Sequence, residues 1–118
     1  MATRYEIETE PEVLQWLSTI SDKEYARVEA HADHLADHAE TLGEPFSRHL
    51  GGKLRELRIR MYGQQVRITY WLAPGRRIVL LTVFRKTKMR ETDQIERARR
   101  AQKACEAGHP PAHTIWSR

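Results

Sequence analysis

Arginine and lysine side chains recur along the middle of this chain at a density that suits an anionic partner. Residues 43–90 contain twelve Lys or Arg and two acids, a local charge of +10. Residues 1–42 hold three basic and ten acidic side chains, so the net charge of +4 conceals a strongly dipolar distribution. A guanidinium group stays charged and can meet two phosphate oxygens at once. The pattern therefore favours a polyanion bound at the middle segment.

Other side chains with chemical potential form weaker patterns. His34 and His38 are four residues apart, a spacing that can bind zinc from a helix, and His31 lies nearby. No cysteine and no HExxH sequence accompanies them, so a solvated helix flank is the better interpretation. The single Cys105 excludes an internal disulfide and is typical of a small core residue. No glycine-rich phosphate loop, Ser-His-Asp pattern or paired-carboxylate signature is present, so other enzyme classes have little support. We expect no metal and no cofactor.

The length and composition are those of one domain. A chain of 118 residues can bury a single core, and we assign residues 1–107 to one domain. Residues 108–118, which include Pro110 and Pro111, are expected to form a flexible tail. No run approaches the roughly 20 apolar residues of a membrane helix, and the N-terminus lacks a signal-peptide pattern. We expect a cytoplasmic protein.

Two helices are expected in the acidic N-terminal part. Thr9 to Glu12 is a helix-start signal, and the apolar residues that follow predict a helix at about 10–19. Ser21 and Glu24 repeat the capping-box pattern, and a second apolar stripe predicts a helix from 22 to about 42. So short a link between them implies an antiparallel helical hairpin.

Strand-length apolar runs separated by turn signals follow in the basic segment. Leu54–Met61 and Gln65–Leu72 alternate apolar with polar residues, which is typical of half-buried strands. Ile78–Phe84 is almost continuously apolar and should be the central strand. Short turns between the three imply antiparallel pairing. On the first strand, alternation puts Arg58 and Arg60 on the face opposite its apolar residues.

A strand at residues 3–8 and a last helix at about 93–106 complete the expected order, β-α-α-β-β-β-α. This order predicts an α+β fold, a two-layer sandwich. The helical hairpin and the C-terminal helix would pack on one side of a small twisted antiparallel sheet. Residues 46–53, which carry Gly51 and Gly52, are expected to form a loop.

Four sequence segments, in the order expected for these elements, resemble a known family. They read GKLRELR at 52–58, VRITY at 66–70, LLTVFRKT at 80–87 and QIERA at 94–98. In these segments the chain is similar to the HigB-like branch of the RelE/ParE toxin superfamily. The resemblance spans roughly residues 5–105 and implies a RelE-like fold.

The resemblance implies the toxin of a type II toxin–antitoxin system. Relatives similar to RelE and HigB cut messenger RNA in the ribosomal A site without a metal, by attack of a ribose 2′-hydroxyl on the adjacent phosphate. The implied partners are that mRNA and a cognate antitoxin, usually of the helix-turn-helix type, which alone would contact operator DNA. ParE-like relatives instead inhibit DNA gyrase. An inactive relative that only binds nucleic acid or its partner is a third hypothesis.

The resemblance also assigns roles to individual basic residues. Arg67 stands at the position of the family's strand arginine, and Arg85 and Lys86 stand where its catalytic basic residues lie. We expect these three to be catalytic and to group with Arg58 on one concave face. General phosphate attraction, and hence RNA binding, is expected of Lys53, Arg55, Arg58, Arg60 and Lys88.

Two departures from the family pattern leave the proton-transfer group open. Many relatives carry Tyr or His directly after the terminal basic pair, but residues 87–90 here read TKMR. Arg55 also stands where an aromatic residue is common. Cleavage requires an acid for the leaving oxygen. The candidates are the basic pair acting without an ordinary base, or histidines of the tail: Arg85, Lys86, His109 and His113.

Overall fold

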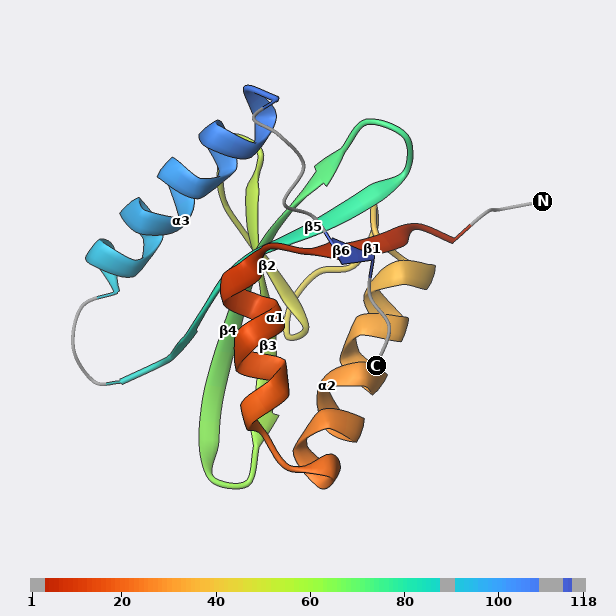
Figure 1. Cartoon of the computed structure of the whole chain (residues 1–118), viewed down its shortest axis with the longest axis vertical. Coiled ribbons are helices and arrows are strands. Elements are labelled where there is room, and N and C mark those ends of the chain that lie inside the picture. Colours follow the sequence, from red (N-terminus) through yellow and green to blue (C-terminus); the bar gives the residue numbers. More distant parts are fainter. Residues whose placement is uncertain (1–3, 88–90, 109–113, 116–118) are drawn as a thin grey trace.

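The computed structural model describes residues 4–87, 91–108 and 114–115. Its elements, in chain order, are β1 (Glu6–Thr9), α1 (Pro11–Thr19), α2 (Asp22–Asp37), β2 (Ser47–Gly51), β3 (Leu54–Met61), β4 (Gln64–Ala73), β5 (Arg77–Arg85), α3 (Thr92–Glu106) and β6 (Thr114–Ile115). Figure 1 shows α1 in front of a twisted sheet with α2 beside it, and α3 well apart from both.

One mixed sheet runs through the molecule, with the strands in the order β2-β3-β4-β5-β1-β6. The pairs β3–β4 and β4–β5 are antiparallel, as their short turns predict. Strand β1 lies parallel to β5, and β6 pairs with the outer edge of β1. The expected α+β fold is confirmed, and the sheet is mixed rather than wholly antiparallel.

Residues 46–53 do not form the expected loop. Ser47–Gly51 is strand β2, which pairs antiparallel with β3 at an edge of the sheet. Gly51, the last residue of β2, has a φ value of 105°, and Gly52, with a φ value of 56°, begins the turn that leads into β3. A Gly-Gly pair between two strands is a hairpin signal as well as a loop signal. The strand is only five residues long, and its exposed residues give no clear alternation.

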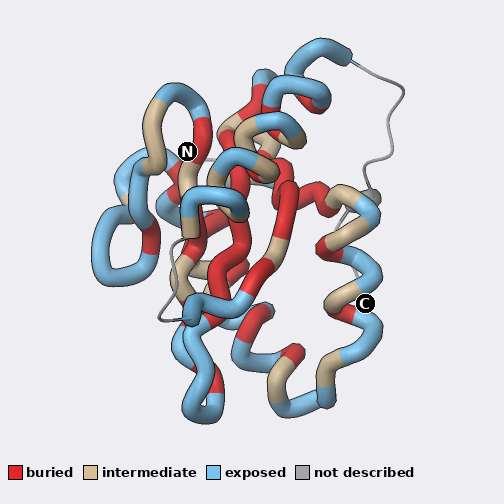
Figure 2. The backbone as a smooth tube through the Cα atoms, turned by 90° about the vertical axis from the view of Figure 1, so that its left-hand side faces the viewer, coloured by how far each residue is buried: buried red, intermediate tan, exposed pale blue. Residues whose placement is uncertain are grey.

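Apolar layers cover both faces of the sheet. In β5, Ile78 and Leu80 pack in the layer formed with α1 and α2, whereas Val79 and Leu81 pack with α3. The three helices are therefore not all on one side, because Ala98 of α3 belongs to the second layer. Burial on both faces explains the near-continuous apolar run of β5. Figure 2 shows this buried centre in red.

The N-terminal helices begin and end for local reasons. Helix α1 starts at Pro11 with Glu10 as its N-cap residue, and no side chain caps it, so the expected hydroxyl cap is absent there. Helix α2 has the expected capping box. It ends at Asp37, earlier than the expected residue 42. No helix in the described ranges is long and apolar enough to span a membrane.

The capping box of α2 gives a first prediction. Ser21 Oγ accepts from the Glu24 backbone N–H at 3.1 Å, and Glu24 Oε1 accepts from the Ser21 N–H at 3.0 Å. Ser21→Ala should lower the free energy of unfolding by about 1 kcal/mol, measured by urea denaturation. Ser18→Ala is the control, because Ser18 Oγ only donates to a carbonyl of its own helix. An equal loss in both variants would contradict the capping role.

Candidate functional site

The pairing of β3 with β4 brings basic residues from two strands onto one face of the sheet. Arg58 is the cross-strand partner of Arg67, and Arg60 is the partner of Gln65. Residues directly opposite in such a pair point to the same face, so these four side chains are neighbours. The apolar residues that alternate with Arg58 and Arg60 along β3 are buried against α1 and α2, which confirms the expected alternation.

An open hollow of about 270 Å³ lies over this pairing, and we call it the basic hollow. The Arg58 side chain is 23% exposed, whereas Arg67 is 3% exposed and lies at the floor. Arg60 is exposed at the rim. An anion that enters meets cations from the side and from below. The full lining is Pro45, Arg58, Arg60, Gln65 and Arg67.

A buried carboxylate lies between two of these arginines. Glu56 Oε2 is 3.7 Å from Nε of Arg67 and 3.8 Å from Nε of Arg58, and the Glu56 side chain is 3% exposed. Burial raises the pKa of the Glu56 carboxyl, against the opposing charge of Arg67. Burial, together with the charge of Arg58, lowers the pKa of the Arg67 guanidinium. Desolvation therefore outweighs attraction in this ion pair.

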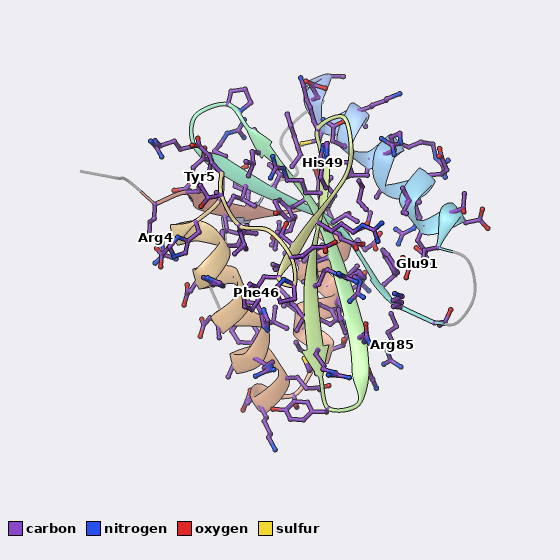
Figure 3. The ribbon with its side chains drawn as sticks, turned by 180° about the vertical axis from the view of Figure 1, so that it is seen from behind. Arg4, Tyr5, Phe46, His49, Arg85 and Glu91 are labelled. Atoms are coloured by element: carbon purple, nitrogen blue, oxygen red, sulfur yellow. The ribbon has the colours of Figure 1, made fainter. Side chains whose placement is uncertain are left out.

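The polar groups of the site are incompletely paired. In the described part of the chain, Glu56 Oε1, Arg67 Nε and Glu91 Oε1 are buried without a hydrogen-bond partner. Arg58 Nη1 approaches Glu44 Oε1 only to 3.9 Å. Figure 3 shows Glu91 on the same side of the molecule as the end of β5. Loose ion pairs of this kind leave the arginines able to exchange a carboxylate for a phosphate.

Arg85 and Lys86 do not join the basic hollow. Arg85 is the cross-strand partner of Val66, which is buried against α1 and α2. The Arg85 side chain therefore lies on the face of the sheet that α1 and α2 cover, opposite to the face of the basic hollow. Its charge acts on Glu24 at the start of α2. Both basic residues line a separate open hollow of about 510 Å³, which we call the turn hollow. Its lining is Gly63, Gln64, Gln65, Arg85, Lys86 and Thr87.

The other basic residues expected to bind RNA are dispersed. Lys53 forms an ion pair with Glu106 of α3, at the end of β3 away from the turn hollow. Arg55 is the partner of Tyr70, whose ring is buried in the layer with α1 and α2. Lys88 lies outside the described residues. Of the residues expected at the site, the structure gathers three in one hollow: Arg58, Arg60 and Arg67.

The histidines of α2 pack around an aromatic ring. The His34 ring lies edge-on to Phe46, at 4.9 Å between centroids, and 5.1 Å from His38. Burial is the main cause that lowers the pKa of His31. Within the described ranges, no group of three His, Cys, Asp or Glu residues could hold a metal ion. Figure 3 shows Phe46 beside α2.

Sequence reasoning missed two residues of the basic hollow. Gln65 precedes Arg67 by two positions on one strand, so a shared face could have been inferred from the period of two. Pro45 precedes β2 and lies outside any periodic element, so no pattern pointed to it. The acid at the mouth, Glu44, is hidden from sequence for the same reason.

Every residue that lines the basic hollow lies within a segment that matches a known protein family. The chain matches the family described as phage derived protein Gp49-like (DUF891) over residues 15–103, from within α1 to most of α3. A search of curated proteins finds no match. The Gp49-like family is RelE-like and associated with toxin–antitoxin systems. The match spans most of the chain, and the chain therefore belongs to the family of Gp49-like phage-derived proteins.

Proposed function

We propose that this chain is the toxin of a type II toxin–antitoxin system and that it cleaves messenger RNA on the ribosome, as HigB-like proteins do. The supporting observation is the basic hollow, in which arginines of two paired strands gather on one face of a Gp49-like chain. Cationic clamps that are already in place can stabilise charge as it develops on a phosphoryl group. The proposal needs no metal.

The chemistry follows from what the hollow offers. The ribose 2′-hydroxyl loses its proton to solvent as its oxygen bonds to the neighbouring phosphorus. The bond from phosphorus to the 5′-oxygen then breaks, and the 5′-oxygen takes a proton from solvent and leaves as a hydroxyl. The phosphorane between these steps carries added negative charge. Arg58 and Arg60 would contact its non-bridging oxygens from the rim. Arg67 would stabilise the charge from the floor, where water is largely excluded. The phosphate would displace Glu44 from its loose pairing with Arg58.

Induction of the chain in bacteria, followed by mapping of transcript 5′ ends, tests this function. Translated messages should acquire cuts in phase with the reading frame, and protein synthesis should stop. A reporter message without its start codon is the control, because it never reaches the ribosomal A site as an elongating message. Continued protein synthesis without such cuts would contradict the nuclease.

A ParE-like inhibitor of DNA gyrase is the second candidate. It is favoured by the sequence TKMR at residues 87–90, which has neither the Tyr nor the His that many RNA-cleaving relatives carry there. A supercoiling assay with purified gyrase separates the two. The nuclease should leave gyrase active, and the gyrase inhibitor should leave transcripts intact.

An antitoxin partner follows from the family association. We propose that it is a helix-turn-helix protein that neutralises the toxin by covering the basic hollow. A short open reading frame of that kind beside this gene would support the assignment. Its co-expression should restore growth to cells that produce the toxin.

A further inference from the structure

Gln65 lies between the basic hollow and the turn hollow, and it lines both. Its cross-strand partner on one side is Arg60, and on the other side its carbonyl accepts the Lys86 N–H at 2.8 Å. The residue is exposed. A ligand that reaches from one hollow into the other must therefore pass over Gln65.

A hydrogen bond from Arg67, at the floor of the basic hollow, fixes the orientation of the Gln65 amide. Nη2 of Arg67 donates to Gln65 Oε1 at 2.8 Å, and a guanidinium has only donors, so the amide oxygen must face it. The amide nitrogen is consequently turned away from Arg67. No acceptor for this nitrogen occurs among the described residues. A neutral double donor is thus held in place between two cationic hollows.

We propose that the two hollows bind successive phosphates of one RNA strand, and that Gln65 donates a hydrogen bond to the nucleotide between them. The proposal rests on the proposed function and extends it to the path of the substrate. It makes Lys86 a ligand of a phosphate next to the cut, rather than of the phosphate that is cut, while Arg85, whose side chain leaves the opposite face of the sheet, adds charge to the turn hollow.

The spacing and charge of the surface support a single strand. Arg67 and Gln65 point to the same face two positions apart on β4, about 7 Å along the strand. That separation, from the floor of the basic hollow to the residue that both hollows share, is on the scale of one nucleotide in an extended chain. The turn hollow has two basic residues and no acid in its lining. A backbone with one negative charge per nucleotide matches two cationic hollows better than a polypeptide does.

A binding assay with RNA that cannot be cleaved tests the path. The purified chain is titrated into a fluorescein-labelled hexanucleotide with a methyl group on every 2′-oxygen, and anisotropy gives the affinity. An unlabelled dinucleotide, which has one phosphodiester and fills one hollow, serves as a competitor. Gln65→Ala should weaken hexanucleotide binding at least fivefold and weaken dinucleotide binding by a smaller factor, because a dinucleotide does not pass from one hollow to the other. Gln15→Ala, an exposed change on α1, is the matched control and should bind as the unaltered chain does.

Salt dependence distinguishes the two kinds of contact. Lys86→Ala removes a phosphate ligand, so the slope of log K against log salt should fall by about 0.7. Gln65→Ala removes a neutral donor and should weaken binding with the slope unchanged. Unaltered binding in Gln65→Ala, an unchanged slope in Lys86→Ala, or no hexanucleotide binding by the unaltered chain would each overturn the proposed path. Transcript cuts in induced cells report on the nuclease separately, since this assay involves no cleavage.

Discussion

Arg58→Ala is expected to lower mRNA cleavage about 100-fold while the fold stays intact. Arg58 lies opposite Arg67 in the basic hollow, and its guanidinium is partly exposed to an entering anion. Removal of one preorganised donor to a developing oxyanion typically costs 10²–10³ in rate. The ion pair of Arg58 with the exposed Glu44 is 3.9 Å long and contributes little to stability. The buried Glu56 keeps Arg67 as its cation at 3.7 Å when Arg58 is removed. The measurement is the rate at which cut transcripts accumulate, at matched protein levels.

Arg55→Ala is the matched control for this prediction. It removes the same charge from the same strand, but Arg55 is opposite Tyr70 and belongs to the other face of the sheet. Cleavage by Arg55→Ala should stay within about twofold of the unaltered chain, since the basic hollow loses only long-range attraction. Equal losses in the two variants would show that net charge matters and that the basic hollow does not. Arg58→Lys should be intermediate, because it keeps the charge and loses the fork.

The basic hollow was largely accessible from sequence because apolar and polar residues alternate along β3 and the first half of β4. Alternation then fixes which side chains share a face, and a short turn at residues 62–63 fixes the antiparallel register. The pairing of Arg58 with Arg67 follows from those two facts. Sequence does not reveal that Glu56, on the same face, is almost wholly buried and brings the hollow closer to neutral.

The position of Arg85 was not accessible from sequence. Strand β5 is apolar on both faces, so no alternation marks the face that its last residue takes. A bulge opposite Thr69 and Tyr70 inserts Leu81 into β5 as an extra residue. The residues of β5 that follow the bulge therefore point to the opposite face from the one that a regular strand would give them. Only the register shows that Arg85 lies opposite the buried Val66.

Pairing between strands that are far apart in the chain could not be predicted from the sequence either. Sequence indicated that β1 exists, but its parallel pairing with β5 joins residues about 70 positions apart, and no turn signal records such a contact. The face chosen by α3 is hidden for a similar reason. Its apolar stripe requires a partner layer, and both faces of the sheet offer one.

Arg67→Met is expected to destabilise the fold by about 3–5 kcal/mol at pH 8, because it leaves the Glu56 carboxylate buried without its nearest cation. A typical domain has only 5–15 kcal/mol of stability, so much of this chain would be unfolded. The loss should shrink at lower pH. Urea denaturation followed by circular dichroism, at pH 5 and pH 8, measures both effects.

The sign of the pH effect follows from the Glu56 carboxyl. Burial raises its pKa and Arg67 opposes the rise, so Arg67→Met leaves burial with less opposition. The folded state then holds the proton more tightly than the unfolded chain. The stability contributed by this group is fully present below the ordinary value of about 4.3 and is lost as pH rises through the folded-state value. A loss that grew towards pH 5 would contradict the assignment.

Adding Glu56→Leu to Arg67→Met should restore stability without restoring cleavage. A buried ion pair can be replaced by apolar side chains of similar volume at little cost, and desolvation already outweighs attraction in this pair. The double variant would be folded at both pH values, yet the floor of the basic hollow would have lost its cation. A folded protein that no longer cuts mRNA would assign Arg67 to the reaction. A folded double variant that still cuts would leave Arg67 a purely structural role.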